Sequence, residues 1–177
     1  MKKILFVFYT IYSITLFSQE KTLDSILNFK LTKNDIIWQK IYPVNDSSKI
    51  VNIKNQIQSQ EFTHKLKIVN NSYNGRSENY GKRLVKNTPY YATWGFDTFL
   101  KIEFKKNKYR VTASDFIFRG PLLNIYGAQK KQDYPLKLNI IRKNKFKNNR
   151  KSLKVLTKLD SILNSKFIIK ETKENNW

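Results

Sequence analysis

The chain has 177 residues, and 34 lysines and arginines against 13 aspartates and glutamates give it a formal net charge of +21. It has no cysteine and one histidine, which excludes disulfides, thiolate metal sites, a cysteine nucleophile, cysteine-linked lipid anchors and any multi-histidine metal site. A hydrophobic content of 40% with 14% aromatics argues against wholesale disorder.

The first 18 residues have the order of a secretory signal peptide. Lys2 and Lys3 supply a positive start, Ile4 to Phe17 is largely apolar, and small Ser18 precedes polar residues. As a helix this apolar segment would span about 21 Å, short of the roughly 30 Å hydrocarbon core. We therefore expect cleavage near Ser18 and an exported single domain over residues 19–177, periplasmic or extracellular. A retained membrane anchor and a buried strand are the alternatives.

The first half of the domain is expected to form short alternating elements. Apolar residues at every second position predict strands, and a three-to-four-residue spacing predicts a helix. The elements expected are a helical turn over 22–28, strands over 29–31 and 36–44, a helix over 47–59, a half-buried strand over 62–68, turns over 70–75 and a weak strand over 76–85.

A β-hairpin over residues 96–118 is the strongest local prediction. Lys106-Asn107 suits a two-residue turn, because asparagine tolerates a left-handed backbone. Pairing residues that sum to 213 places apolar side chains on one face and brings Glu103 opposite Arg110 on the other face. In a regular strand Asp115 would face inward, whereas a bulge near Ser114 would turn it outward and bring in two phenylalanines.

The C-terminal part begins with two glycines and two prolines within residues 119–135, which predict an irregular loop. Residues 137–148 are ambiguous. Asn149 is a candidate N-cap for a final helix over 150–172, in which leucines recur at helical spacing. The hexapeptide Leu-Asp-Ser-Ile-Leu-Asn occurs at residues 23–28 and again at 159–164, which we interpret as a coincidence of biased composition.

Three features carry a family resemblance: an early tryptophan strand, DIIWQKI over 35–41, the hairpin sequence FKKNKYRV over 104–111, and a final helix ending in Asn-Asn-Trp. With the export signal, the chain resembles a family of secreted bacterial domains of unknown function with a TATA-binding-protein-like fold. The resemblance covers roughly residues 28–177. That family more usually has Asp-Gly where this chain has Lys106-Asn107. The resemblance implies a sheet gripping a long helix, and it implies neither DNA binding nor catalytic residues.

Together these patterns predict an α+β fold. We expect a curved antiparallel sheet of about five strands, packed against a long C-terminal helix and one shorter helix, in a TATA-binding-protein-like or helix-grip-like arrangement. The helix-grip alternative would allow a cavity for a small apolar ligand between the sheet and the helix.

Residues with catalytic potential are few. His64 lies on the apolar face of its expected strand, where a buried-edge histidine is the expected interpretation. Asp115 would be a functional candidate only if it were buried. No Walker loop, GxGxxG, HExxH, GxSxG or EF-hand pattern occurs. We therefore expect no enzyme, no cofactor and no metal site.

A run of nine bases without an acid is the strongest local signal for a partner. The nine are Lys137, Arg142, Lys143, Lys145, Lys147, Arg150, Lys151, Lys154 and Lys158. Such runs dock on anionic surfaces, although lysine and asparagine abundance also fits a merely compositional charge. Only Phe146 interleaves the bases, so specific nucleic-acid binding is not expected.

The leading hypothesis is an exported, non-enzymatic binding or scaffold domain. Its partner would be an anionic polysaccharide, lipopolysaccharide or another envelope protein. The alternative is a carrier that holds an apolar ligand in a cavity between sheet and helix.

Overall fold

The structure, a computed structural model, describes residues 25–33, 35–81, 84, 88–125 and 127–169. The expected signal peptide over 1–18 lies outside the described residues, and so do residues 170–172 of the expected final helix, which ends earlier in the structure, at Phe167. Within the described part of the chain, no helix has both the length and the apolar character needed to cross a bilayer.

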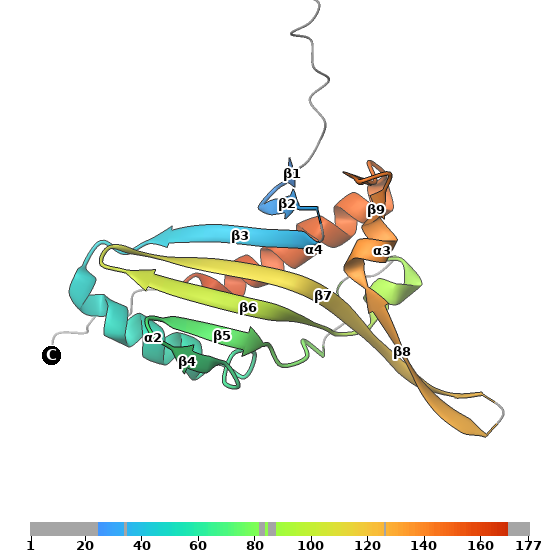
Figure 1. Cartoon of the computed structure of the whole chain (residues 1–177), viewed down its shortest axis with the longest axis horizontal. Coiled ribbons are helices and arrows are strands. Elements are labelled where there is room, and N and C mark those ends of the chain that lie inside the picture. Colours follow the sequence, from blue (N-terminus) through green and yellow to red (C-terminus); the bar gives the residue numbers. More distant parts are fainter. Residues whose placement is uncertain (1–24, 34, 82–83, 85–87, 126, 170–177) are drawn as a thin grey trace, which may run out of the picture.

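An antiparallel sheet forms the centre of the fold (Figure 1). Its strands pair in the order β1-β2-β3-β7-β6-β5-β4, and β8 pairs with the outer part of β7. Their bounds are β1 Ser25–Ile26, β2 Phe29–Leu31, β3 Ile36–Pro43, β4 Lys67–Val69, β5 Ser72–Arg76, β6 Phe96–Lys105, β7 Lys108–Ile125 and β8 Ala128–Pro135. The α+β class is confirmed, but a count of about five strands is wrong, because the described chain forms an eight-stranded sheet.

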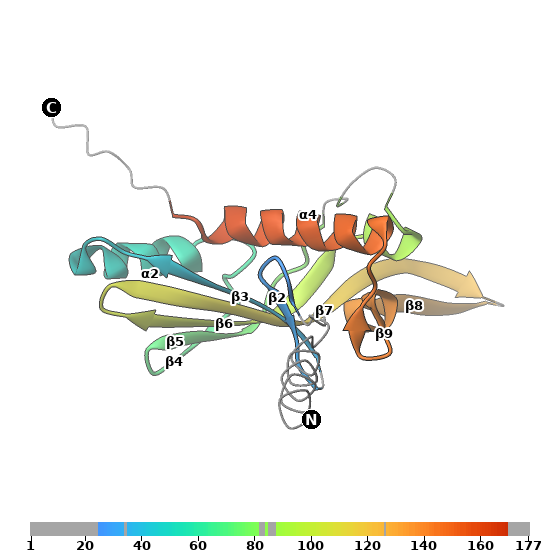
Figure 2. The ribbon, with the colours of Figure 1, turned by 90° about the horizontal axis from the view of Figure 1, so that it is seen from above.

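The helices pack mainly on one face of this sheet, where α4 and α2 lie on the same side (Figure 2). Their bounds are α2 Ile50–Gln58, α3 Leu136–Ile140 and α4 Arg150–Phe167, with 3-10 turns at Ser47–Lys49 and Tyr90–Thr93. The expected helices over 47–59 and from residue 150 are therefore confirmed. The Asn149 side chain caps α4 by accepting a hydrogen bond from the Ser152 amide at 2.9 Å.

The hydrophobic core lies between α4 and the inner face of the sheet. Leu156, Leu159 and Leu163 of α4 are fully buried, and the Trp38 ring lies 6.5 Å from the Phe167 ring, centroid to centroid. Because these side chains occupy the interface, nothing observed among the described residues favours a ligand cavity there.

The hairpin of β6 and β7 has the predicted register. Phe104 pairs with Tyr109 and Ile102 with Val111, and all four are buried. On the opposite face the Arg110 guanidinium donates to the Glu103 carboxylate at 2.7 Å. The hairpin prediction is therefore confirmed at the level of individual pairs.

A β-bulge interrupts this hairpin near its far end. The register shifts between Asp97 and Phe99 of β6, and Asp115 of β7 takes a left-handed backbone with a φ of +47°. Phe116 and Phe118 consequently return to the buried face. The inward placement of Asp115 is wrong and the bulge alternative is correct, because the Asp115 side chain is 53% exposed.

Beyond the bulge, β7 and β8 extend from the body as a two-stranded arm (Figure 1). The expected irregular loop over 119–135 is therefore wrong. A second register shift between Arg119 and Leu122 accommodates the Gly-Pro pair, and Gly127 adopts a φ of +81° near the tip. β8 pairs with β7 alone, and a strand with a single neighbour tolerates the proline at its end.

The expected strand over 62–68 forms only at its end, as β4. The Thr63 hydroxyl donates to the Ile57 carbonyl at the end of α2, and the Thr63 amide donates to the Gln60 carbonyl at 3.0 Å. These bonds keep the segment in turns. His64 consequently points outward with a 47% exposed side chain, so its placement on an apolar face is wrong.

Two weaker expectations also differ from the structure. The strand expected over 76–85 does not form in its described part, since β5 occupies Ser72–Arg76 and Tyr80 makes only an isolated bridge with Phe96. Residues 82, 83 and 85 lie outside the described residues. The helical turn expected over 22–28 is instead β1 followed by a turn in its described part, residues 25–28, where Leu27 has a φ of +56°. Local turn chemistry prevails there over apolar spacing.

The two copies of the repeated hexapeptide adopt different structures and touch each other. The described part of the first copy lies in β1 and its turn, whereas the second copy lies inside α4. Asn28, the last residue of the first copy, donates to the Asp160 carboxylate of the second at 2.7 Å. The Trp38 indole donates to the same carboxylate oxygen at 2.8 Å.

Candidate functional site

The nine bases of the run gather at one end of the molecule, on α3, a small hairpin and the first half of α4. We call this region, residues 136–158, the basic lobe. Its hairpin pairs β9 (Ile141–Arg142) with β10 (Lys145–Phe146). Figures 1 and 2 place this lobe at the end opposite to α2 and the β6–β7 turn.

The turn of the β9–β10 hairpin brings two bases of the basic lobe opposite each other. Lys143 and Asn144 both have positive φ, +51° and +55°, which fits a two-residue hairpin turn. Arg142 and Lys145 are therefore direct cross-strand partners. Like charges directly opposite each other repel, so this arrangement costs stability unless an anion lies nearby.

The first half of α4 adds a stripe of bases. Lys151, Lys154 and Lys158 follow at intervals of three and four residues, which places them on one side of the helix. At this spacing lysines repel each other, whereas a lysine and a glutamate would pair. The stripe therefore adds positive charge to the first half of α4, which follows the hairpin along the chain.

Most of these bases make no ion pair within the described chain. Lys147 instead donates from its ammonium to the Asn139 carbonyl at 2.7 Å. Among the described residues, those of the run that form no salt bridge with a carboxylate are Arg142, Lys143, Lys145, Lys147, Arg150, Lys151 and Lys158.

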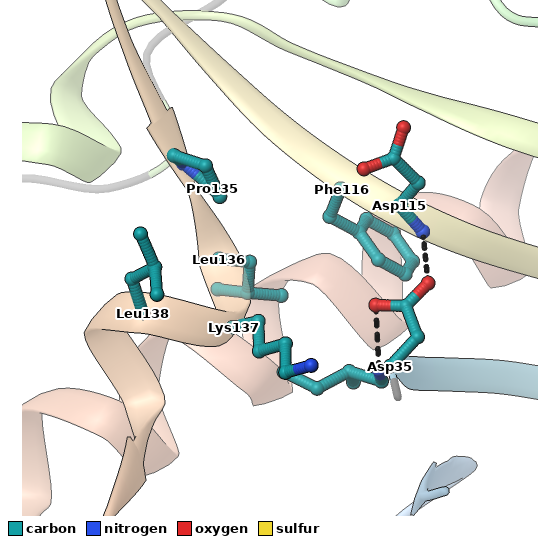
Figure 3. Close-up of a pocket in the computed structure, with 8 residues that line it drawn as sticks. Asp35, Asp115, Phe116, Pro135, Leu136, Lys137 and Leu138 are labelled. Carbon is teal, nitrogen blue, oxygen red and sulfur yellow. Dashed lines mark hydrogen bonds between the residues drawn. The ribbon is translucent and has the colours of Figure 1, made fainter. Parts of the chain in front are cut away.

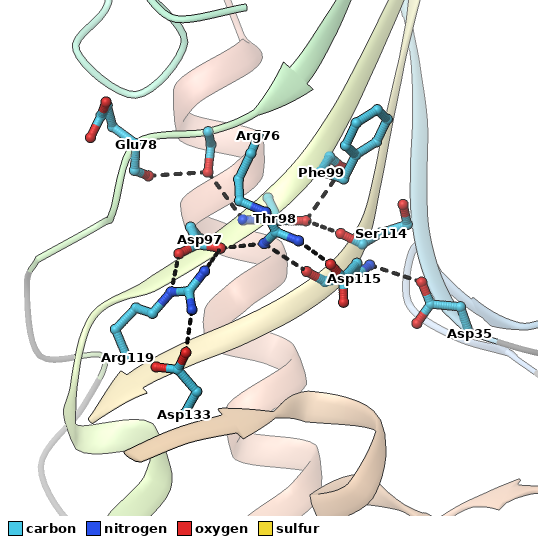
Figure 4. Close-up of polar contacts among 11 residues, drawn as sticks. Asp35, Arg76, Glu78, Asp97, Thr98, Phe99, Ser114, Asp115, Arg119 and Asp133 are labelled. Carbon is cyan, nitrogen blue, oxygen red and sulfur yellow. Dashed lines mark hydrogen bonds and ion pairs between the residues drawn. The ribbon is translucent and has the colours of Figure 1, made fainter. Parts of the chain in front are cut away.

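Three acidic residues, Asp97, Asp115 and Asp133, lie on the sheet face opposite α4. An ion-pair network there alternates acid and base in the order Asp115, Arg76, Asp97, Arg119 and Asp133 (Figure 4). It joins four neighbouring strands, β5, β6, β7 and β8. This network ties the bulge and the base of the arm to the body of the sheet.

Asp97 is the buried centre of this network. Its side chain is only 7% exposed and receives hydrogen bonds from Arg76 and from two nitrogens of Arg119. The hydrogen bond to Asp97 holds the pKa of Arg119 above its usual value. The sequence does not predict this network, because Arg119 and Asp133 lie in the segment that was expected to form an irregular loop.

A groove of about 520 Å³ lies where α3 meets β7 and the start of β3. Asp35 and Asp115 line it together with apolar residues of α3 and β7 (Figure 3). The Asp35 carboxylate accepts hydrogen bonds from the Ile36 amide at 2.7 Å and the Asp115 amide at 2.8 Å, and Asp115 pairs with Arg76. Both carboxylates are therefore engaged in holding the bulge.

Other candidate groups do not converge. The aromatic residues near 90–99 are divided, since Phe96 is fully buried whereas Tyr90 and Phe99 are 59% and 42% exposed on different elements. The buried Trp94 indole nitrogen has no hydrogen-bond partner. Within the described residues, no cluster of three or more histidines or carboxylates could hold a metal ion.

No protein-family model matches the sequence, and neither a curated protein nor a solved structure shows significant similarity to the chain.

Proposed function

We propose that this chain is an exported, non-enzymatic binding domain that attaches to polyanionic surfaces of the cell envelope through its basic lobe. The observation that carries the proposal is the concentration of nine bases on α3, the β9–β10 hairpin and the first half of α4; seven of these bases form no salt bridge among the described residues. Uncompensated charge at one end produces a directed field that attracts anionic polymers.

The arrangement of the sheet and its helices is suited to carry the basic lobe on a rigid body. We propose that the sheet and its long C-terminal helix form a TATA-binding-protein-like arrangement; the helix lying across one sheet face supports this, although the sheet has more strands than that pattern led us to expect. The ion-pair network stiffens the opposite face. A rigid body with charge at one end suits attachment rather than catalysis.

A matched pair of triple variants tests this function. The first variant, Arg142→Gln, Lys143→Gln and Lys145→Gln, removes three charges from the β9–β10 hairpin. The second removes three equally exposed charges from the β6–β7 turn at the other end of the molecule. Its substitutions are Lys105→Gln, Lys106→Gln and Lys108→Gln.

Binding to lipopolysaccharide micelles and to dextran sulfate is measured at low and high salt. The lobe variant should lose at least about tenfold in affinity, because each charge near an anionic surface contributes about 1 kcal/mol. The β6–β7 turn variant should lose less than about threefold, and binding should fall steeply with salt. Equal losses in both variants would show that only the total charge matters and would reject the lobe as a site.

A further inference from the structure

The basic lobe also carries an exposed apolar side chain. Leu138 on α3 is 73% exposed, more than any other large hydrophobic residue of the described chain. Its neighbours Leu136 and Ile140 are buried against the body, and Figure 3 shows Leu136 and Leu138 on different sides of α3. The single turn of α3 is thus fixed by its inner side chains and presents Leu138 outward.

Bases flank this leucine along the chain, and the two carboxylates that line the groove beside it, Asp35 and Asp115, are held by backbone amides and by Arg76. Lys137 precedes it on α3, and the β9–β10 hairpin, which begins at Ile141 directly after α3, carries the exposed bases Arg142, Lys143 and Lys145. An apolar side chain with lysines and arginines around it is the pattern of proteins that lie on a membrane surface, where bases contact anionic headgroups and the apolar group enters the acyl boundary. A hydrated polysaccharide would offer Leu138 no comparable gain.

We infer that the polyanionic surface bound by the basic lobe is a bilayer containing anionic lipid, and that Leu138 inserts into it. This inference rests on the proposed function and adds the identity of the surface. The bases supply attraction that depends on salt, and Leu138 supplies a contribution that salt does not screen. The lobe thereby distinguishes a lipid surface from a soluble polymer of the same charge.

A single introduced cysteine can report insertion, since the chain contains none of its own. Leu138→Cys carries an environment-sensitive fluorophore, and Val51→Cys is the matched control. Val51 is 65% exposed and lies on α2 at the other end of the molecule. With vesicles of phosphatidylethanolamine and phosphatidylglycerol, the fluorophore at position 138 should shift to the blue, and the one at position 51 should not.

A second pair of variants measures the apolar contribution. Leu138→Ser should lower the vesicle partition coefficient about five- to tenfold, the scale expected for burying part of a leucine side chain. Val51→Ser should leave it unchanged. Both variants should bind dextran sulfate as the unaltered chain does, because neither changes the charge.

The possible outcomes separate the two proposals. A shift at position 138 with the loss in Leu138→Ser supports insertion. Vesicle binding without either effect overturns insertion and leaves the polyanion function standing. Binding to dextran sulfate without binding to vesicles overturns the lipid assignment alone. If the chain binds neither probe at low salt, both proposals fail.

Discussion

Because Asp97 is the buried member of the ion-pair network on the sheet face opposite α4, we expect its substitution to lower stability more than that of the other acids in the network. Replacing it by asparagine removes the charge while keeping the shape, and leaves Arg76 and Arg119 facing a neutral amide. Removing one partner of a buried ion pair costs about 3–5 kcal/mol. Both guanidiniums keep some contact with solvent, at 36% and 21% side-chain exposure, and each retains a second carboxylate. We therefore expect Asp97→Asn to lower the free energy of unfolding by about 2–3 kcal/mol.

Asp133→Asn is the matched control, because Asp133 binds the same Arg119 guanidinium at the surface. Its side chain is 36% exposed against 7% for Asp97, and exposed pairs contribute about 0–1 kcal/mol. Urea unfolding followed by tryptophan fluorescence gives both changes, provided that the m-values agree. If Asp97→Asn costs no more than Asp133→Asn, burial does not set the strength of this network and the reasoning is refuted.

Three further substitutions test other parts of the fold. Burial raises the pKa of Tyr109 to about 12 from its ordinary value of 10.0. The neutral hydroxyl therefore contributes fully to stability below pH 10, and this contribution is lost as the pH rises through 12. Tyr109→Phe should reduce the slope of the unfolding free energy against pH in this range by up to about 1.4 kcal/mol per pH unit, and an unchanged slope would contradict this. Gly120→Ala should loosen the arm, because its added methyl would overlap the Gln132 carbonyl oxygen, and faster proteolysis of the arm together with a lower Tm is expected. Asn149→Ala removes the cap of α4 and should cost about 1 kcal/mol in thermal unfolding; no change would mean that water replaces the cap.

The β6–β7 hairpin was predictable because three independent signals agreed there. A two-residue turn, a period of two and complementary charges all required the same register, and a shift by one residue would have moved every apolar side chain to the other face. The cap and the leucine spacing of α4 similarly reinforced each other. Where local and long-range preferences coincide, sequence alone predicts structure reliably.

The arm and the segment after α2 were missed for a different reason. Glycine and proline at 120–121 are typical of loops, but a bulge accommodates them within paired strands. The alternating residues from Phe62 onward are typical of a strand, yet the end of α2 leaves carbonyl groups that Thr63 satisfies. Both outcomes depend on hydrogen-bond partners that become visible only in three dimensions.

The candidate site was only partly visible in the sequence. The bases of the lobe could be identified from their spacing, because they are consecutive along the chain. Asp97 could not be connected to Asp115 and Asp133, because the bulge and the arm decide which strands bring these carboxylates to the same two arginines. The sequence does not distinguish Leu138 as exposed, since a single leucine between two polar residues can lie on either side of a helix. Its exposure becomes evident only when Leu136 and Ile140 are known to be buried.

The hexapeptide that occurs twice has a consequence for the order of folding. Two identical stretches have the same intrinsic preferences, so neighbouring segments must select an edge hairpin for one and a helix for the other. Asn28 and Trp38 both depend on Asp160 for a hydrogen bond, and Asp160 is translated more than 120 residues later than either of them. The N-terminal edge of the sheet therefore gains these two hydrogen bonds only when α4 docks, so we expect this edge to become ordered late in folding.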